Sequence, residues 1–583
     1  MIPARWTFRE PSSMETIDRL ASALDLHPVV CQILAQRGFD TPESITGFLR
    51  PDLASIHNPF LLKDMHQAVE RIDRALKKGR PMLVYGDYDV DGITASAMLA
   101  ECLTGYGGKV QVRLPNRVTE GYGLHPRVIE EAHRNGIALI ITVDCGVSDH
   151  AAATRARDLG IDLIVTDHHH PPDILPEAAA IINPKQLDCP YPYKDLAGVG
   201  VALKLVQALA LSRQGRQMSL HQVGYWPEAL NRYLDLVCLG TIADVMPLTG
   251  ENRVLVKFGL EALRDTIRPG LWALKEASGI NGKEMTAGAV GFVLAPRINA
   301  TGRMQGPEAG LRLLMTDSAQ EGEHLARLLN QQNQKRREVE EGILRTAHRK
   351  IKEGFYLEEE MAIILADSDW HPGVIGIVAQ KLVEEFYRPA ILISLQSGIG
   401  KGSARSIPCI HLYALLEHCR HLLKDFGGHA RAAGLTIDEG MIPAFRKRAN
   451  EVLNEHYIRE ELVPEMTVDA VIDGNSLDTS LVEQLEILAP FGSANPEPAL
   501  CMKGLCQTTP PRLLKDAHIK VRFRGTSGIH EAIGFNMRHV WERMTGSLGE
   551  HAWDVVFYPQ INNWQGARTI QLRLKDIKAH ASH

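Results

Sequence analysis

The sequence lacks the features that mark several protein classes. Its nine cysteines are scattered, odd in number and without a CxxC pair, which argues against a disulfide framework and a zinc ribbon. No window holds the roughly 18 consecutive apolar residues of a membrane span, and the N-terminal MIPARWTFREPSSMET has no apolar signal core. There are no internal repeats and no low-complexity tract. We therefore expect a reduced, globular, cytoplasmic protein.

Charge is spread unevenly along the chain. With 583 residues, 45% of them hydrophobic, the chain is long enough for about three or four domains. The net charge is -6, yet residues 501–583 carry twelve Lys or Arg against six Asp or Glu. That segment is near +6 and the remainder near -12. A basic C-terminal segment suits nucleic-acid binding, and a merely solvated basic face is the alternative.

Apolar strands alternate with helices in the first half of the chain. Strands are predicted at 82–86, 138–144 and 162–167, and helices at 92–103 and 149–160. This order is typical of a doubly wound parallel sheet. Residues 318–353 contain no proline and predict one long helix, or two nearly continuous ones. A second α/β region begins with a strand at 361–367, and alternating sequence at 518–525 and 569–576 predicts a small β-barrel.

Acidic and histidine residues gather where the strands of the first region end. They are Asp87, Asp89 and Asp91 after 82–86, Asp144 at the end of 138–144, the run Asp167-His168-His169 at the end of 162–167, and Asp244 after the apolar segment LDLVCLG. Each Asp alone has an ordinary alternative as a helix N-cap or turn residue. Together they lie at the edge where a doubly wound sheet binds ligands. Three carboxylates within five residues repel one another, and a divalent cation would compensate them.

The type of ligand suggests which ion. Carboxylates with one imidazole favour Mn²⁺ or Mg²⁺ over zinc, because no thiolate is expected among the ligands. Cys145 adjoins Asp144, but in an extended segment its side chain should point to the opposite side.

Several motifs resemble a known family. The stretches GDYDVDG, ITVDCG, VTDHH and GTIADVMPL resemble the four motifs of the DHH phosphoesterase superfamily, and FGGHARAAG (426–434) resembles that of its associated second domain. Five more resemble the bacterial RecJ family in particular: PNRVTEGYG (115–123), PRINATGRM (296–304), HPGVIGIVAQKL (371–382), GSARSI (402–407) and LAPFGSANPEP (488–498). The resemblance covers nearly the whole chain.

The resemblance implies roles for the residues at the strand ends. The implied ligands of two Mn²⁺ or Mg²⁺ ions are Asp89, Asp91, Asp144, His168 and Asp244, with Asp144 bridging the ions. Asp87 is expected beside them as an accepting group, and His169 near the scissile phosphate. His170 exceeds the usual histidine pair and is assigned a structural role.

The resemblance also implies substrate contacts. Ser403 and Arg405 would hold a 5′ phosphate with help from Arg117, although GSARS read alone is also an ordinary turn. Gly428 and His429 would approach a phosphate, the alternative being a core histidine. Arg522 and Arg524 alternate with apolar residues on the barrel, an expected oligonucleotide-binding (OB) fold. Trp541, Trp553 and Trp564 would stack on bases or belong to the core.

The function that follows is metal-dependent 5′-to-3′ exonuclease activity on single-stranded DNA, in repair and recombination. Single-strand-binding protein and a helicase are the expected partners of a monomer. The alternatives are a phosphodiesterase of short oligonucleotides or cyclic dinucleotides, and a non-catalytic DNA-binding scaffold. The predicted multidomain α/β chain has an N-terminal helical segment (1–50), a DHH domain (51–260), a helical connector (261–353), a DHH-associated domain (354–460) and an OB domain (461–583).

Overall fold

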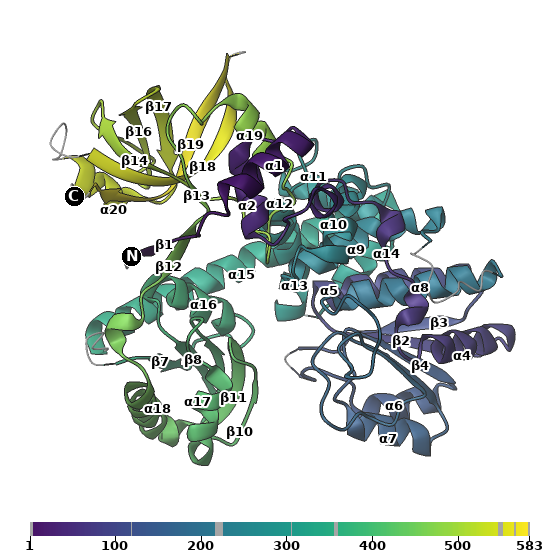
Figure 1. The fold of residues 1–583 in the computed structure, drawn as a ribbon. Helices are drawn as coiled ribbons and strands as arrows, with labels where there is room; N and C mark the ends of the chain where they lie inside the picture. The colour runs from purple at the N-terminus through teal and green to yellow at the C-terminus, as the bar shows by residue number, and fades with distance from the viewer. Residues whose placement is uncertain are drawn as a thin grey trace. The chain divides into compact units, whose positions relative to one another are not determined.

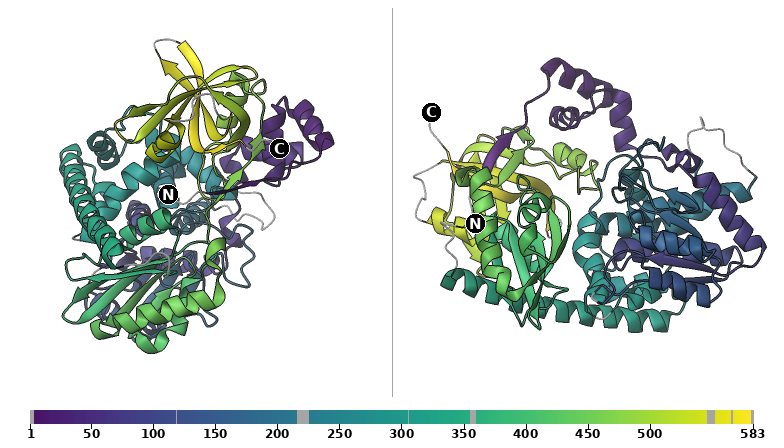
Figure 2. Two further views of the ribbon diagram at one scale, coloured as in Figure 1. Left: turned by 90° about the vertical axis from the view of Figure 1, so that its left-hand side faces the viewer. Right: turned by 90° about the horizontal axis from the view of Figure 1, so that it is seen from below.

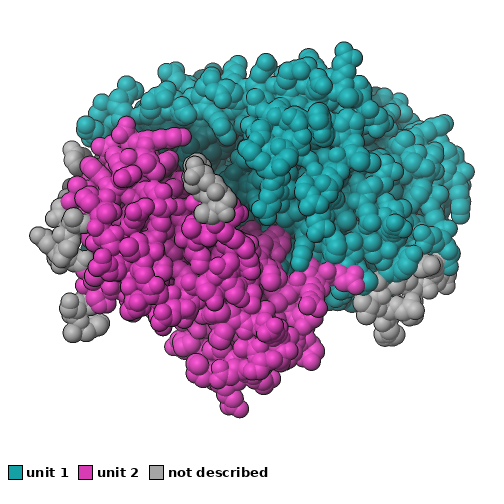
Figure 3. Space-filling model, turned by 90° about the horizontal axis from the view of Figure 1, so that it is seen from above, with its two compact units in different colours: residues 1–3, 53–464 teal, residues 4–52, 465–583 magenta. Residues whose placement is uncertain are grey.

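A computed structural model describes residues 4–117, 119–215, 225–304, 306–354, 360–545, 552–564 and 567–580. The chain forms two compact units (Figure 3). One contains residues 1–3 and 53–464, and the other contains residues 4–52 and 465–583. None of the helices among the described residues is long and apolar enough to cross a membrane.

The first unit begins with a five-stranded parallel sheet of order β3-β2-β4-β5-β6. Its strands are β2 (Met82–Gly86), β3 (Val110–Arg113), β4 (Leu139–Val143), β5 (Asp162–Thr166) and β6 (Ala180–Ile182). Alternate residues of each strand enter two different cores. Val84 and Ile141 face α5 (Val90–Gly105) and α8 (Gly198–Arg213), whereas Leu83 and Ile140 face α6 (Pro126–Arg134) and α7 (His150–Asp158). Helices cover both faces, which confirms the predicted doubly wound sheet (Figure 1).

The apolar segment before Asp244 differs from the strand ends with which we had grouped it. It lies in the helix α9 (Leu234–Ala243), and Asp244 is the C-cap residue of that helix. Residues Leu234–Thr241 are all buried, including Gly240, which packs directly against Asp91 and Thr94. A helix that is buried all round has no polar stripe, so its sequence cannot be distinguished from that of a buried strand.

One helix links the two α/β parts of the first unit. The predicted long helix is confirmed as α15 (Ala319–Gly354), 36 residues without interruption (Figures 1 and 2). Leu325 and Leu329 of its first half belong to the core of the parallel-sheet lobe. Ile343 and Ile351 of its second half belong to the core of the following lobe.

The second lobe has a mixed five-stranded sheet of order β10-β11-β9-β8-β7. Its strands are β7 (Ile363–Asp367), β8 (Ala390–Gln396), β9 (Ile399–Arg405), β10 (Asp425–Gly428) and β11 (Ala432–Asp438). Only β7 and β8 run parallel, and the other neighbours are antiparallel. The helices α16 (Ile375–Phe386) and α18 (Ile442–His456) contribute to its core.

The second unit is a closed β-barrel to which the N-terminal segment is joined. Strands β14 (Leu500–Gln507), β18 (Ala552–Trp564), β19 (Ala567–Ala579), β17 (Gly528–Gly534) and β16 (His518–Gly525) pair in that order, and β14 pairs back to β16. This closure confirms the predicted barrel. The helices α1 (Met14–Leu24), α2 (Pro28–Gln36) and α3 (Pro42–Leu49) share its core. A short strand, β1 (Arg5–Phe8), pairs with β12 (Glu465–Val468), a contact that the sequence did not predict.

Candidate metal centre and phosphate site

The acidic residues predicted from the strand ends meet at one place. Nε2 of His168 lies 3.1 Å from Oδ1 of Asp144, 3.5 Å from Oδ2 of Asp244 and 4.0 Å from Oδ2 of Asp91. Three groups have ligand atoms within 4.8 Å of one another, and they are Asp87-Asp89-Asp144, Asp91-His168-Asp244 and Asp144-His168-His169. Asp144 belongs to two of these groups, which is the arrangement expected of a carboxylate shared by two ions. Every residue predicted as a metal ligand is therefore in this cluster.

Local structure sets the positions of these carboxylates. Oδ1 of Asp89 caps α5 by accepting from the backbone N–H groups of Asp91 (3.0 Å) and Gly92 (3.2 Å). Both oxygens of Asp91 accept from the N-terminus of α8, from Gly198 N at 2.7 Å and Val199 N at 2.8 Å. The N-cap interpretation is thus correct for Asp89, and this residue is also part of the cluster.

Asp144 has an unusual backbone and a close neighbour. Its φ of 62° is left-handed, so the segment at the end of β4 is not extended as we had assumed. Cys145 is nevertheless directed away from the cluster, into the core beneath α6 and α7. A Cβ at Gly198 would lie 2.5 Å from Oδ1 of Asp144, so only glycine allows the start of α8 to approach this carboxylate.

The electrostatics of the cluster call for positive charge. Burial, followed by repulsion from neighbouring carboxylates, raises the pKa of Asp91 and Asp144 well above the ordinary value. Burial and the charge of Asp89 raise the pKa of Asp244 to about 7. Burial and the nearby His169 lower the pKa of His168 to about 3, which keeps the imidazole in the neutral form that binds metals.

Unpaired buried atoms support the same conclusion. Among the described residues, Oδ1 of Asp87, Oδ1 of Asp144 and Nε2 of His168 are buried without a hydrogen-bond partner. Buried polar atoms are rarely left unsatisfied, because each costs roughly 1–3 kcal/mol. These oxygen and imidazole donors suit Mn²⁺ or Mg²⁺, and the residues present therefore fit a divalent-ion centre.

His169 is held by two residues that the sequence reasoning did not assign. Its Nδ1 lies 2.7 Å from Oδ1 of Asp167 and 3.1 Å from the hydroxyl of Tyr122, which also donates to the carbonyl of Asp144. Burial alone would lower the pKa of His169, but the hydrogen bond to Asp167 and the surrounding acids raise it to about 9. His169 is thus protonated near neutral pH. The sequence signal for the contact with Asp167 was its position two residues before His169. His170 is exposed.

Positive residues of both lobes of the first unit form a second site. Arg405 lies on β9 beside Ser403, with its Nη1 3.4 Å from the Ser403 hydroxyl. Burial and the charge of Arg117 lower the pKa of Arg405. Arg303, which the sequence reasoning missed although its motif was noted, donates to the carbonyl of Gly373 at 3.2 Å. Burial, Arg117, Arg336 and Arg405 lower its pKa to about 9.

These three arginines, Arg117, Arg303 and Arg405, will be called the arginine cluster. The charge of Arg117 lowers the pKa of Arg303 and Arg405, and an anion that relieves this repulsion is the natural ligand of the cluster. The guanidinium carbon of Arg117 also lies 5.0 Å from the centre of the Tyr88 ring, next to the acidic turn after β2. The arginine cluster and the acidic cluster around His168 are therefore neighbours within the first unit.

Gly428 and His429 lie at the hairpin between β10 and β11. Gly428 has φ 141°, and a Cβ there would lie 2.4 Å from the carbonyl of Ala432, so the hairpin itself requires glycine. His429 is exposed, which contradicts the alternative of a core histidine. Burial of part of the ring and the charge of Arg405 lower its pKa, and His169 adds to the effect.

The barrel residues are in the other unit. Arg522 and Arg524 are exposed on β16, and Arg522 lies 3.8 Å from Glu531. The barrel unit as a whole has 17 Lys or Arg against 20 Asp or Glu, so its basic C-terminal segment is offset by the acidic residues joined to it. Trp553 is buried and belongs to the core, and Trp541 is half-buried with its Nε1 donating to Pro511. The side chain of Trp564 lies outside the described residues.

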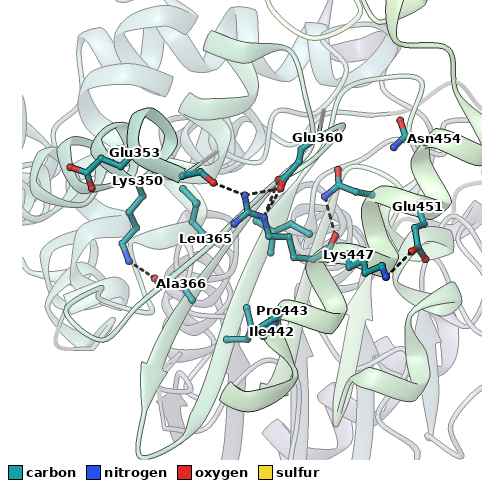
Figure 4. Close-up of a pocket in the computed structure, with 14 residues that line it drawn as sticks. Lys350, Glu353, Glu360, Leu365, Ala366, Ile442, Pro443, Lys447, Glu451 and Asn454 are labelled. Atoms are coloured by element: carbon teal, nitrogen blue, oxygen red, sulfur yellow. Dashed lines mark hydrogen bonds and ion pairs between the residues drawn. The ribbon is translucent and has the colours of Figure 1, made fainter. Parts of the chain in front are cut away.

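A separate cavity of about 790 Å³ lies in the second lobe, between the end of α15, β7 and α18 (Figure 4). Several of its charged residues already have partners. Arg446 binds both carboxylate oxygens of Glu360, and Lys350 donates to the carbonyl of Ala366 at 2.8 Å. The residues predicted for catalysis and substrate binding do not line it.

Comparison with known proteins places this geometry in a family. Residues 81–241 match the DHH family N-terminal domain, 358–455 the DHHA1 domain and 468–576 the RecJ OB domain. The chain is 36% identical over 575 residues to the single-stranded-DNA-specific exonuclease RecJ of Bacillus subtilis (strain 168), covering 98% of this chain and 70% of that protein. It is 34% identical over 571 residues to that of Escherichia coli (strain K12), covering 95% of this chain and 96% of that protein.

A solved structure gives the same result. The crystal structure of RecJ from Thermus thermophilus in complex with Mn²⁺ has a TM-score of 0.83 and 30% identity, covering 99% of this chain and 80% of that one. The chain therefore belongs to the RecJ family of DHH proteins.

Proposed function

We propose that this protein is a 5′-to-3′ exonuclease that uses two Mn²⁺ or Mg²⁺ ions to hydrolyse single-stranded DNA in repair and recombination. The observation that carries the proposal is the convergence of three carboxylates from sequence-distant segments on His168, each within 4.0 Å of its Nε2. The match over 98% of the chain to a relative named for this activity supports it further. A phosphodiesterase of short oligonucleotides or cyclic dinucleotides is not favoured.

The residues of the acidic cluster divide the work of hydrolysis. Asp89, Asp91, Asp144, His168 and Asp244 hold the ions, and Asp87 lies beside them with its Oδ1 available to accept a hydrogen bond. When bound there, the ions supply an acidified water and neutralise charge on the phosphate.

His169 completes this machinery. Because its Nδ1 is occupied by Asp167, its Nε2 is the nitrogen that donates a proton to the leaving oxygen or to the phosphate. Asp167 and Tyr122 fix the ring in that orientation.

The arginine cluster recognises the 5′ end. Arg117, Arg303 and Arg405 provide planar donors for a terminal phosphate, and Ser403 adds a hydroxyl. A phosphate also neutralises the mutual repulsion that lowers the pKa of Arg303 and Arg405. His429 and the backbone near Gly428 contact the same strand.

The barrel unit also binds the single-stranded DNA. Arg522 and Arg524 contact phosphates, and binding is insensitive to base sequence. Single-strand-binding protein and a helicase as partners, a monomeric state and a cytoplasmic location stay predictions from the family resemblance.

End-labelled DNA tests the proposed function. With Mn²⁺ or Mg²⁺, a 5′-labelled single strand should release its label at once as a mononucleotide, and a blunt duplex should resist. Release of a 3′ label first, or equal cutting of the duplex, would contradict the proposal. The double variant Asp89→Ala/Asp144→Ala should bind DNA but not cut it, whereas a non-catalytic scaffold would keep every function after both changes.

A further inference from the structure

The loop after β3 carries Arg117 at the head of a closed turn. The carbonyl of Asn116 accepts from the backbone N–H groups of Glu120 at 2.8 Å and Gly121 at 3.2 Å. Oδ1 of Asn116 accepts from Thr119 N at 3.2 Å. Arg117 thus directly follows Asn116, the residue that accepts these hydrogen bonds.

The side chain of Glu120 connects this turn to neighbouring elements through hydrogen bonds and ion pairs. Its Oε2 accepts from the backbone N–H of Asn116 at 2.8 Å, and its Oε1 accepts from Arg113 at the end of β3 at 3.1 Å. Arg127 of α6 donates to the same oxygen. The side chain is only 15% exposed, so these charge-assisted contacts are partly shielded from water. The carbonyl of Glu120 also lies 2.8 Å from Nε2 of His125.

Arg117 needs such a fastening. Its guanidinium carbon lies 5.0 Å from the centre of the Tyr88 ring, and the carbonyl of Tyr88 lies against Gly302, the residue before Arg303. Its charge lowers the pKa of Arg303 and Arg405, so repulsion acts to push it away from the arginine cluster. A flexible side chain on a free loop would move to reduce that repulsion in the absence of substrate. A fixed turn keeps the three guanidinium groups together before a phosphate arrives, which lowers the entropy cost of binding.

We propose that Glu120 is a positioning residue for recognition of the 5′ end, acting through Arg117. Its carboxylate closes the turn at Asn116 and anchors it to β3 and α6, and this fixes Arg117 in the arginine cluster. The inference rests on the proposed function, in which Arg117 contacts the terminal phosphate.

The variant Glu120→Gln tests the proposal in the full-length protein with Mn²⁺. The measurement is kcat/KM on single strands that carry either a 5′ phosphate or a 5′ hydroxyl. We expect about a tenfold loss on phosphorylated ends, mostly in KM, and a change of less than about twofold on hydroxyl ends. The hydroxyl ends report whether the metal centre and the fold are intact.

Two matched variants sharpen the measurement. Glu131→Gln removes the other carboxylate partner of Arg113, 51% exposed on α6, without touching the turn, and should leave the end preference unchanged. Arg127→Gln removes one donor to Glu120 from α6 and should shift the preference in the same direction by a smaller factor. If Glu120→Gln fails to fold, Arg127→Gln still decides the outcome.

A double-mutant cycle separates this inference from the proposed function. In an Arg117→Ala background, Glu120→Gln should cause no further loss of end preference, because the residue acts through Arg117. Additive effects, or equal losses on both kinds of end, would overturn the positioning role. If Arg117→Ala reduces the preference and Glu120→Gln does not, only the inference fails. If Arg117→Ala itself leaves the preference intact, the proposed phosphate contact fails as well.

Discussion

The two sheets of the first unit carry opposite charge at their functional ends. The parallel sheet directs buried carboxylates toward His168, and burial with like-charge repulsion raises their pKa. The mixed sheet presents Arg405 on β9 near Arg117 and Arg303, and burial with like-charge repulsion lowers the pKa of Arg405 and Arg303. At each site the protein supplies too few side chains of the opposite charge to compensate the charge that is gathered there.

Under the proposed function, this opposition of charge divides one cleavage reaction between the two lobes. Neither site is stable as a collection of like charges alone, so each is built to bind a ligand of opposite sign. Under the proposed function, cations bind at the first site and a phosphate binds at the second. Changes in the first site should affect the rate of bond cleavage, and changes in the second should affect which DNA end is chosen.

The largest effect is expected from Asp144→Asn. The substitution removes a charge shared by two groups of the acidic cluster while keeping the shape of the side chain. Loss of metal-assisted catalysis costs several kcal/mol of transition-state stabilisation, so kcat on phosphorylated single strands should fall about a thousandfold or more. Asp158→Asn, an exposed substitution on α7, is the control and should retain full activity. Retention of kcat by Asp144→Asn would contradict the assignment of the metal centre.

A smaller and more selective effect is expected from Arg405→Ala. In the proposed function its planar donors bind the terminal phosphate, and loss of such a partly buried charge-assisted contact would cost about 2 kcal/mol, or roughly thirtyfold in kcat/KM on 5′-phosphorylated strands. Activity on 5′-hydroxyl strands should change little, since the metal centre is untouched. Arg420→Ala, whose side chain is 70% exposed in the same lobe, is the control. Equal loss on both ends would show that the two lobes are not divided as argued.

The charge imbalance of the metal centre also predicts a dependence of stability on pH. The pKa of Asp244 is about 7 in the metal-free fold, because of burial and Asp89, against an ordinary value near 4. A carboxyl whose pKa is raised by folding stabilises the fold below its unfolded pKa and loses that contribution as pH rises through the folded pKa. The melting temperature of the metal-free protein should therefore fall between pH 5 and pH 8.

Asp244→Asn should weaken that dependence. With the carboxyl removed, the melting temperature at pH 8 in EDTA should rise by about 2 °C and change less between pH 5 and pH 8. Asp265→Asn, an exposed substitution in the same unit, should match the unsubstituted protein. Thermal unfolding followed by circular dichroism measures both, and a lower melting temperature for Asp244→Asn at pH 8 would contradict the electrostatic argument.

The sequence predicted the charged residues of both sites except Arg303, but it did not predict the contacts that hold them. The predicted strand 82–86 coincides with β2, and the carboxyl end of a parallel strand is where Asp87 and Asp89 had to lie. The supporting residues Tyr122 and Arg303 come from loops and helices far along the chain. Their contribution depends on distances across the fold, which no local pattern encodes.

Long-range pairing also explains the remaining differences. Strand β1 pairs with β12, some 460 positions away, so residues 4–52, which include the predicted N-terminal helices, belong to the same compact unit as the barrel. The apolar stretch before Asp244 is a helix buried on all sides. Because its apolar residues show no helical periodicity, its sequence could not be distinguished from that of a buried strand.

The smallest expected effect concerns the barrel, whose exposed arginines should bind DNA without choosing an end. If Arg524 contacts one phosphate, Arg524→Ala should lower the slope of log affinity against log salt by about 0.7, and it should do so for both 5′-phosphorylated and 5′-hydroxyl strands. Arg568→Ala, ion-paired with Glu483 on the same unit, is the control and should leave the slope unchanged. Fluorescence anisotropy in EDTA over a range of KCl measures binding without cleavage. A change confined to phosphorylated strands would mean that end recognition is not limited to the arginine cluster, because the barrel would then share it.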